Sequence, residues 1–316
     1  MELRTGNTTL AISFSIGLSY YSFVRAGSTR RWETQSPGCT KSLRRTHYNV
    51  EPEDPMGMFR LQGRTALVTG ASRGIGRATA LQLAAQGAAV GVNYHSRADA
   101  AHNVVEQIRQ MGGRAAALQA DVTSPAAVKK MTAAAQAELG PIDILVNNAG
   151  LLFRGDLLAY ETKEFDQMWE VNVKGILHVT AAVAPAMIER KYGRIINLSS
   201  IAALGTGFSG TTLYAATKAA VLILTKRFAL ELGHAGITAN AVLPGLTVTD
   251  MVSAGMNPGE IQQMTQNAAS KSMLARAGQP DDIANVITFL ASEESGFMTG
   301  QFLSVDGGRM DFLTHA

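Results

Sequence analysis

Tyr214 and Lys218 are the two side chains whose types and spacing most directly suggest chemistry. They lie four residues apart in a stretch with a helical pattern, so both should share one face of a helix. A tyrosine with its ordinary pKa of about 10 is a weak acid or base at neutral pH, and an adjacent ammonium group favours its phenolate form. The pair therefore predicts a tyrosine whose pKa is lowered by the lysine and that exchanges a proton with a substrate.

A second stretch with unusual spacing follows an apolar run at residues 65–68, where Gly70, Gly74 and Gly76 occur close together. The glycines lie where a strand is expected to turn into a helix. The unpaired N–H groups at a helix start suit a phosphate, and glycine lets a pyrophosphate approach the backbone. The spacing is not the common Gly-x-Gly-x-x-Gly pattern, but its position predicts a bound dinucleotide.

Two arginines indicate which dinucleotide is bound. A dinucleotide-binding sheet usually has an acid at the end of its second strand that holds the ribose 2′-hydroxyl. Here residues 93–97 read Asn-Tyr-His-Ser-Arg, without an acid. Arg73 and Arg97 flank that place, and arginine pairs bidentately with a phosphate. We therefore expect NADP(H) to be preferred, with NAD(H) possible, although Arg97 alone could be a solvated residue at a helix start.

The elements that must position these residues alternate regularly after residue 58. Short apolar runs alternate with helical segments, which indicates right-handed βαβ units and a parallel sheet covered on both faces. We predict an α/β fold, a single doubly wound Rossmann-type domain whose parallel seven-stranded sheet has helices on both faces. The expected strands are 65–68, 88–94, 115–120, 142–147, 194–199, 238–243 and 302–305, and the expected helices are 75–86, 98–111, 125–139, 163–190, 214–233 and 280–291.

Composition excludes several classes of protein. The chain has 316 residues, 46% hydrophobic and 17% charged, which is an ordinary globular balance. Its net charge is +3, but residues 1–57 hold seven basic and five acidic residues, which leaves a net charge of +1 for the remainder. A net charge this close to zero gives residues 58–316 no basic surface of the kind that binds nucleic acid. Cys39 is the single cysteine, which excludes an internal disulfide and a cysteine-rich zinc site, and we expect no metal.

Residues 1–57 form an N-terminal extension that differs from the domain expected at 58–316. The apolar patch at residues 10–24 is too short and too polar for a membrane span, which needs ~20 apolar residues. Three interpretations stay open: an organelle transit peptide, a secretory signal peptide, and a disordered tail or untranslated upstream sequence. The cysteine usage fits a reducing compartment. We expect the cytoplasm, or a mitochondrion or plastid if residues 1–50 are a transit peptide.

Several short motifs, in a fixed order, resemble those of the short-chain dehydrogenase/reductases. They are Thr69-Gly70-Ala71-Ser72-Arg73-Gly74-Ile75-Gly76, Asp121-Val122, Asn147-Asn148-Ala149-Gly150, Val171-Asn172-Val173, Ile196-Asn197-Leu198-Ser199-Ser200, Tyr214-Ala215-Ala216-Thr217-Lys218, Pro244-Gly245 and Val305-Asp306-Gly307-Gly308. The resemblance covers essentially all of residues 58–316. It implies an enzyme that transfers a hydride between a nicotinamide cofactor and a ketone or secondary alcohol.

The resemblance gives catalytic roles to Asn172, Ser200, Tyr214 and Lys218. Tyr214 would protonate the alkoxide formed by hydride addition to a ketone, or deprotonate an alcohol in reverse. Ser200 would hold the substrate oxygen, and Lys218 would also contact the nicotinamide ribose. Asn172 would hold a water that links Lys218 to solvent, although it could instead cap a helix kink. Ser199 and Ser200 should face opposite ways at a strand end, and the family's pattern favours Ser200.

The resemblance also implies cofactor contacts at the ends of several strands. Asp121 should accept a hydrogen bond from the adenine amino group with Val122 against the ring, and Asn148 should line the adenine-ribose side. Thr247 and Thr249 should meet the nicotinamide carboxamide, unless Thr249 caps the next helix. The full expected set is Gly70, Ser72, Arg73, Gly74, Ile75, Gly76, Arg97, Asp121, Val122, Asn148, Ala149, Gly150, Tyr214, Lys218, Pro244, Gly245, Thr247 and Thr249.

Among branches of the family, the likeness is greatest to the 3-oxoacyl-[acyl-carrier-protein] reductases of fatty acid biosynthesis. It rests on the stretches Val-Asn-Asn-Ala-Gly, Tyr-Gly-Arg-Ile-Ile-Asn and Met-Thr-Gly-Gln-Phe-Leu-Ser-Val-Asp-Gly-Gly. This implies a 3-oxoacyl thioester as substrate, carried on an acyl carrier protein. The alternatives are another carbonyl compound, such as a sugar, steroid or quinone, and a non-catalytic NADP-binding regulator. Of two basic residues expected beside the cleft to dock the carrier protein, Lys191 supplies one, but Ala235 stands at the second position.

Two further expectations concern the lid and the assembly. Residues 246–276 should cover the substrate, and their methionines suggest an adaptable pocket or plain core; these are Met251, Met256, Met264 and Met273. The helix at 214–233 is apolar almost all round, more than one covered face requires. The excess predicts burial against a second subunit. The resemblance to the family implies a homodimer or homotetramer, built on this helix and on 165–190. We expect Leu222 to point outward.

Overall fold

The computed structural model describes residues 21–26, 29–34, 58–206, 208–253 and 255–310. The chain divides into two compact units, Met1–Pro55 and Met56–Ala316. In the first unit, β1 (Tyr21–Ala26) pairs with β2 (Thr29–Thr34) in an antiparallel hairpin that the sequence analysis does not anticipate. The sequence left open whether residues 1–57 are a targeting peptide or a disordered tail. Apart from this hairpin, those residues lie outside the described ranges.

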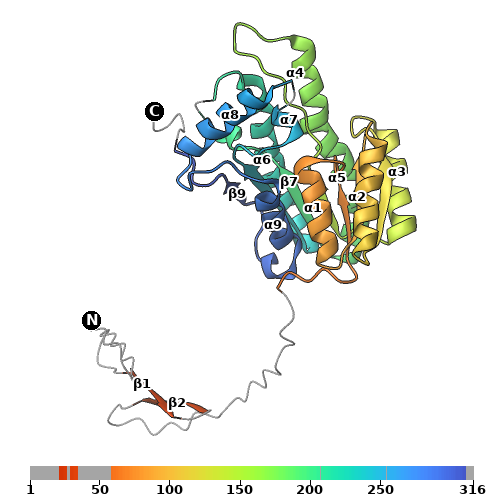
Figure 1. The fold of residues 1–316 in the computed structure, drawn as a ribbon. Coiled ribbons are helices and arrows are strands. Elements are labelled where there is room, and N and C mark those ends of the chain that lie inside the picture. The colour runs from red at the N-terminus through yellow and green to blue at the C-terminus, as the bar shows by residue number, and fades with distance from the viewer. Residues whose placement is uncertain (1–20, 27–28, 35–57, 207, 254, 311–316) are drawn as a thin grey trace. The chain divides into compact units, whose positions relative to one another are not determined.

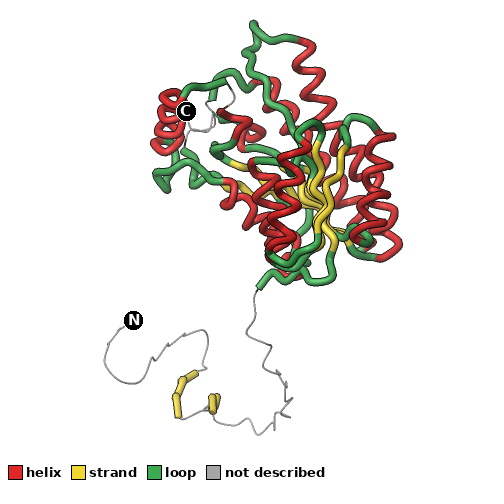
Figure 2. The backbone as a smooth tube through the Cα atoms, turned by 45° about the vertical axis from the view of Figure 1, so that its right-hand side comes forward, coloured by secondary structure: helices red, strands yellow, loops and turns green. Residues whose placement is uncertain are grey.

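A seven-stranded parallel sheet organises the second unit, in the order β5-β4-β3-β6-β7-β8-β9 (Figure 2). The strands are β3 (Thr65–Val68), β4 (Ala89–Tyr94), β5 (Ala115–Gln119), β6 (Ile144–Asn147), β7 (Gly193–Leu198), β8 (Ile237–Pro244) and β9 (Phe302–Val305). Every residue of β3, β4, β6, β7 and β8 is buried, as a sheet covered on both faces requires. The predicted doubly wound α/β fold is confirmed.

Two layers of helices enclose the sheet (Figure 1). A hydrophobic core lies on each face of the sheet, between the sheet and the layer of helices that covers that face. In each core, apolar helix residues pack against alternate residues of the strands. The first layer consists of α1 (Gly74–Ala85), α2 (Ala98–Gln110) and α9 (Pro280–Ala291), and the second of α3 (Pro125–Leu139), α5 (Gly175–Arg190) and α6 (Thr212–Leu232). Each strand ends at the same edge, so the loops that follow the strands converge there.

The expected single helix at 163–190 is interrupted. It consists of α4 (Thr162–Trp169), a π-helical turn at Glu170–Lys174, and α5. The wider turn brings Asn172 fully inside, with no exposed surface. Such π-helical turns frequently occur at functional sites. The interruption therefore gives the polar Asn172 side chain a buried position beside the carboxyl edge of the sheet.

The stretch Thr162–Arg190 also has the length and apolar character of a membrane span. Among the described residues it is the one such candidate, and half of its most apolar window is buried inside the domain. Val179 and Val183 of α5 pack in the core beneath the sheet. This environment is typical of the core helix of a globular domain.

The expectation that Leu222 points outward from α6 is wrong. Its side chain is 7% exposed and packs with Ala241 and Leu243 of β8. The reason lies in the helical spacing, because Leu222 is four residues after Lys218 and shares its inward face. The exposed apolar residues of α6 are instead Ile223 and Leu230, at 62% and 69%.

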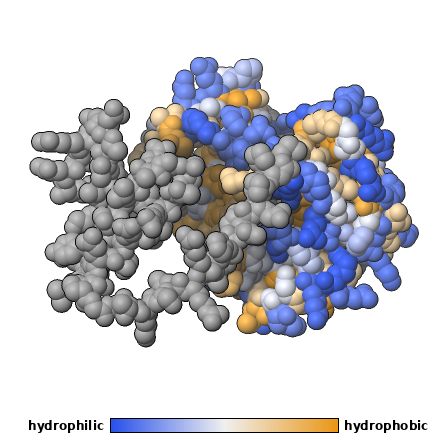
Figure 3. All heavy atoms as spheres, turned by 90° about the horizontal axis from the view of Figure 1, so that it is seen from below, coloured by the Kyte–Doolittle hydropathy of each residue, from blue (hydrophilic) through white to orange (hydrophobic). Residues whose placement is uncertain are grey.

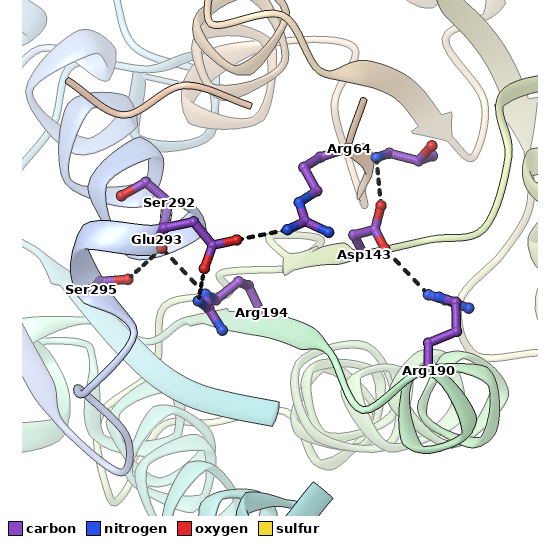
Figure 4. A network of polar contacts seen from close by, with 8 residues as sticks. Arg64, Asp143, Arg190, Arg194, Ser292, Glu293 and Ser295 are labelled. Carbon is purple, nitrogen blue, oxygen red and sulfur yellow. Dashed lines mark hydrogen bonds and ion pairs between the residues drawn. The ribbon is translucent and has the colours of Figure 1, made fainter. Parts of the chain in front are cut away.

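The amino edge of the sheet is closed by charged side chains (Figure 4). Arg194 donates a 3.0 Å hydrogen bond to Glu293, and Asp143 accepts hydrogen bonds from the Thr65 backbone at 3.1 Å and from Arg190 at 3.4 Å. The labelled members of this network are Arg64, Asp143, Arg190, Arg194, Ser292, Glu293 and Ser295. Because these groups satisfy one another, this edge is a structural clamp on the strands that position the site at the opposite edge.

The surface of the domain is mixed in polarity. Where it is visible, the face drawn in Figure 3 carries hydrophilic residues interspersed with smaller hydrophobic patches. The most exposed large apolar side chains are Phe297 at 105% and Leu158 at 95%. Among the described residues, no group of three or more His, Cys, Asp or Glu side chains could hold a metal ion.

Candidate active site

Two adjoining cavities open at the carboxyl edge of the sheet. One extends from the glycine-rich turn to the ends of β4 and β5, and the other contains Ser200, Tyr214 and Lys218. Residues that line both cavities are Ile75, Asn148, Gly150, Leu151, Thr249 and Met251. The shared lining makes the two cavities parts of one cleft, with the candidate catalytic residues in one part and the candidate phosphate-binding residues in the other.

The glycine-rich turn between β3 and α1 can be formed only with glycine at some positions. Gly70 and Gly74 have φ values of 62° and 54°, which side chains rarely adopt. A Cβ atom at Gly76 would lie 2.4 Å from the Gly70 carbonyl oxygen. Asn93 accepts a hydrogen bond from the Gly70 N–H, and Asn148 donates two to the carbonyls of Thr69 and Gly70. Hydrogen bonds thus hold the turn in place, and the three glycines leave its backbone open to close approach, which fits a pyrophosphate above it.

Arg73 and Arg97 both line the cavity at the end of β4. The space between them also contains Asp250, the first residue of α7 (Asp250–Ser253). The Asp250 carboxylate lies 3.5 Å from the Arg73 guanidinium and 4.0 Å from that of Arg97. The sequence analysis misses Asp250, because the residue is remote in sequence from both arginines and belongs to no motif.

Asp121 and Val122 follow β5 and line the same cavity. One Asp121 oxygen accepts hydrogen bonds from the N–H and the hydroxyl of Thr123, at 2.9 and 2.8 Å. The other oxygen lies 3.9 Å from His95. Val122 is 6% exposed and packs against Gly175. The pair presents a carboxylate oxygen and an apolar side chain, which suits an adenine ring.

Tyr214 and Lys218 lie on the inward face of α6, as their spacing predicts. The Lys218 Nζ donates a 2.8 Å hydrogen bond to the Leu198 carbonyl at the end of β7 and lies 5.7 Å from the Tyr214 ring centroid. Burial raises the pKa of Tyr214 to about 12, although a hydrogen bond with Ser200 opposes the rise. Burial also lowers the pKa of Lys218 to about 8.

The expected lowering of the Tyr214 pKa by Lys218 is therefore not found in this structure. Desolvation is the larger effect on Tyr214, and Ser200 is the group that counters it. The Lys218 ammonium is directed to the Leu198 carbonyl. The lysine is itself desolvated, so its charged form is disfavoured as well.

The two adjacent serines after β7 point in different directions. Ser199 is buried and donates a 2.8 Å hydrogen bond to the Lys218 carbonyl. Ser200 accepts a hydrogen bond from the Ala202 N–H at 3.1 Å, and its hydroxyl meets Tyr214. Ser200 is therefore the serine that can contact a substrate oxygen beside Tyr214, while Ser199 fastens β7 to α6.

Asn172 joins three segments around the cleft. Its amide oxygen accepts a 2.8 Å hydrogen bond from the Leu151 N–H, and its amide nitrogen donates to the Leu151 carbonyl at 2.9 Å and to Thr217 at 3.0 Å. A Cβ atom at Gly150 would lie 3.2 Å from the Asn172 oxygen and 3.6 Å from the Lys218 Nζ. The side chain thus fixes the loop after β6 against α6, next to Lys218.

The segment after β8 crosses the cleft. Thr247 is buried, and its hydroxyl donates a 3.2 Å hydrogen bond to the Gly245 carbonyl, so its donor is already engaged. The Thr249 side chain would lie 3.4 Å from a Cβ atom at Gly74, which places it directly over the glycine-rich turn. The lid then continues through α7 and α8 (Pro258–Ser270).

The inner part of the cleft, beside Tyr214, is mainly apolar. Its apolar lining includes Leu151, Leu152, Leu198, Ile201, Phe208, Leu246, Met251 and Val252. Met256 and Met264 of the lid line a further outer cavity, whereas Met273 is 73% exposed and lines neither. Arg154, whose guanidinium lies 5.1 Å from the Phe208 ring centroid, lines both the inner and outer cavities. The sequence analysis overlooks Arg154 because it lies in an irregular loop.

The residues considered for carrier-protein docking are not beside the cleft of this chain. Lys191 precedes β7 and Ala235 precedes β8, so both lie at the amino edge of the sheet. A six-residue strand such as β7 spans about 20 Å. The expectation that Lys191 lies beside the cleft is therefore wrong for this chain, because a residue that precedes a parallel strand lies at the edge opposite the cleft.

Comparisons with known proteins give consistent results. A family model described as "Enoyl-(Acyl carrier protein) reductase" matches residues 70–309. The 3-oxoacyl-[acyl-carrier-protein] reductase FabG of Staphylococcus aureus is 43% identical over 245 residues, covering 78% of this chain and 97% of the relative.

Two solved structures share the fold closely. A 7α-hydroxysteroid dehydrogenase complexed with NADH and 7-oxo glycochenodeoxycholic acid superposes with a TM-score of 0.75 at 36% identity, covering 81% of this chain and 97% of the other. A gluconate 5-dehydrogenase from Burkholderia cenocepacia, in complex with NADP and tartrate, has a TM-score of 0.74 at 37% identity, covering 82% and 98%.

The fold, the cleft and these matches together define the class. The chain belongs to the short-chain dehydrogenase/reductase family, and it is an oxidoreductase of that family that uses a nicotinamide cofactor.

Proposed function

We propose that this protein is an NADP(H)-dependent reductase of 3-oxoacyl thioesters. The observation that carries the proposal is the hydrogen-bonded pair Ser200 and Tyr214, which are partly buried and line an apolar pocket that adjoins the glycine-rich turn. An apolar pocket suits an acyl chain better than a sugar. The 3-oxoacyl-[acyl-carrier-protein] reductase that is 43% identical supports the same substrate class.

The bound nicotinamide would supply or accept the hydride, and the chain's own residues would control the proton. Tyr214, with a pKa of about 12, stays protonated throughout the neutral range and can donate to an oxygen that becomes an alkoxide. Ser200 would hold that oxygen by a hydrogen bond. Lys218 and Asn172 would position the ribose side of the cleft, because Asn172 fixes the loop after β6 beside Lys218.

The preference for NADP(H) follows from charge at the end of β4. Arg73 and Arg97 flank the place of the ribose 2′-position, and both guanidinium groups already bind one anion, the Asp250 carboxylate. A phosphate carries more charge and more acceptor oxygens than a carboxylate. No acid follows β4 to hold a free 2′-hydroxyl, since residues 93–97 read Asn-Tyr-His-Ser-Arg.

Reduction of another carbonyl compound is the second candidate function. It is favoured by the two solved relatives, a 7α-hydroxysteroid dehydrogenase and a gluconate 5-dehydrogenase. Arg154 adds a positive charge to the apolar pocket of this chain, which would suit an anionic group on such a substrate. A non-catalytic NADP-binding role is disfavoured, because Ser200, Tyr214 and Lys218 are all present and adjacent.

The test compares substrates at equal concentration with saturating NADPH. The specific rate, followed as loss of NADPH, should be at least tenfold higher for a 3-oxoacyl thioester than for a simple ketone, a sugar or a steroid. The same assay with a pantetheine thioester and with a carrier-protein thioester shows whether the carrier itself contributes. A rate that is highest for a sugar or steroid would contradict the proposed substrate.

A further inference from the structure

Asp250 occupies the place that the proposed function gives to the 2′-phosphate of the cofactor. Its carboxylate lies between the guanidinium groups of Arg73 and Arg97, at 3.5 and 4.0 Å. Two other carboxylates of the same cavity have other partners. Asp121 accepts hydrogen bonds from Thr123, and Glu170 pairs with Lys174.

The carboxylate and a phosphate cannot both hold these two arginines in the same way. If the 2′-phosphate of NADP(H) takes its place between Arg73 and Arg97, Asp250 must give up both ion pairs or leave two anions in contact. NAD(H) has only a hydroxyl there and makes no such demand. The cost of displacing Asp250 therefore falls on one cofactor alone.

We propose that Asp250 is a specificity-determining residue that competes with the cofactor 2′-phosphate for Arg73 and Arg97. The proposal rests on the proposed preference for NADP(H). Both ion pairs are exposed, with 58% of the Asp250 side chain accessible, so their contribution is modest. The competition should weaken NADPH binding by about 3- to 10-fold, which leaves the phosphate the stronger ligand.

The same competition reaches the substrate pocket. Asp250 begins α7, and the next two residues, Met251 and Val252, line the apolar pocket beside Tyr214. Ion pairs to Arg73 and Arg97 tie this end of the lid to the cofactor cavity. If the phosphate of NADP(H) displaced Asp250, the start of α7 would lose its ion pairs to Arg73 and Arg97. With NAD(H) bound, those ion pairs would remain, so the lid would be held in one complex and released in the other.

The experiment measures dissociation constants of NADPH and NADH, by fluorescence titration, for the intact chain and for Asp250→Asn. The variant keeps the size of the side chain and removes its charge. NADPH should bind about 3- to 10-fold more tightly to Asp250→Asn, with NADH changed less than twofold. Asp166→Asn is the matched control, because Asp166 lines the same cavity. It should change the ratio of the two constants less than twofold.

Three results would overturn the proposal. They are an unchanged NADPH affinity in Asp250→Asn, an equal gain in Asp166→Asn, and a weaker NADH complex, which would make Asp250 a ligand of the ribose hydroxyl. The variant Arg73→Ala shows whether only the role of Asp250 is wrong or whether the proposed preference for NADP(H) is wrong as well. If that variant weakens NADPH and NADH equally, the arginine does not bind a phosphate and both proposals fall. If it weakens NADPH selectively, only the role of Asp250 is rejected.

Discussion

Tyr214 and Lys218 illustrate what burial does to a pair of titratable side chains. Desolvation raises the pKa of the phenol to about 12 and lowers that of the ammonium to about 8, so both groups move toward their neutral forms. A protonated tyrosine is the form required to donate to an alkoxide. In the reduction direction the site is therefore already in its reactive protonation state at neutral pH.

The pKa of Lys218 gives a pH dependence of stability with a defined sign. Between about pH 8 and the ordinary lysine pKa of 10.5, the lysine is protonated in the unfolded chain and largely neutral in the folded one. The unfolded state then binds more protons, so the free energy of unfolding rises with pH, by up to about 1.4 kcal/mol per unit.

Lys218→Met should lack this rise. Urea unfolding of the intact chain and the variant between pH 8 and pH 10 measures the difference, because the titration of Tyr214 and of the other groups is common to both proteins. We expect the intact chain to gain about 2 kcal/mol relative to Lys218→Met over this interval. A difference that does not vary with pH would show that the lysine is not desolvated in the folded protein.

The adjacent serines should separate catalysis from stability. Ser200→Ala should lower kcat by 10²-fold or more, on the order of the loss when a donor to a developing oxyanion is removed, and loss of its partly exposed hydrogen bond from the Ala202 N–H should cost no more than about 1 kcal/mol of stability. Ser199→Ala should instead lose about 1 kcal/mol of stability, because it removes the buried hydrogen bond to the Lys218 carbonyl. Kinetics and urea unfolding on both variants check this assignment, and equal loss of activity in the two would refute it.

At the scale of elements, the sheet has two edges with different tasks. Residues after the strands form the cleft. Asp143 before β6, Arg194 at the start of β7 and Glu293 after α9 form the charged clamp. Because the clamp satisfies its own polar groups, it can hold the strands in register without contributing chemistry. Stability and activity should therefore respond to different substitutions.

Asp143→Ala tests this division. The substitution removes the acceptor of the buried Thr65 N–H and the partner of Arg190. We expect a loss of about 2–3 kcal/mol in the free energy of unfolding, the cost of leaving a buried donor unsatisfied. The KM values for cofactor and substrate should stay within twofold when measured well below the melting temperature. A selective change in KM for NADPH would contradict the view of this edge as structural.

Sequence patterns predicted the strands, the outer helices and the cleft residues, because these depend on local periodicity and on short motifs. They missed what depends on packing between distant segments. The π-helical turn at Asn172 arises from its contacts with Leu151 and Thr217, and Asp250 meets Arg73 and Arg97 only in the folded chain. The pKa of Tyr214 likewise depends on burial, which no spacing reveals.

At the scale of the whole molecule, exposed apolar side chains on α6 indicate an assembly. Ile223 and Leu230 are largely exposed on the same helix that carries Tyr214 and Lys218. Contact of these two apolar side chains with water is unfavourable, and packing against a second copy of the chain would bury them. We propose that α6 packs across a two-fold axis in a homodimer or homotetramer.

Ile223→Lys should therefore dissociate the assembly, because an unpaired charge is costly to bury. The molar mass from light scattering at micromolar concentration should fall toward that of a single chain. Met111→Lys is the matched control, since Met111 is also about half exposed but ends α2 on the other side of the sheet. A monomeric intact chain, or equal dissociation by both variants, would exclude an interface on α6.

The central claim is that Tyr214 donates the proton in a hydride transfer from NADPH. Tyr214→Phe removes only the hydroxyl, whereas Tyr192→Phe removes one at the amino edge of the sheet, where burial also raises the pKa to about 12. The decisive measurement is the rate of NADPH oxidation with a 3-oxoacyl thioester in both variants, together with their NADPH dissociation constants. We predict that Tyr214→Phe loses at least 10³-fold in rate with NADPH binding within about threefold, while Tyr192→Phe keeps its rate. Turnover by Tyr214→Phe above a few per cent of the intact rate would contradict the account.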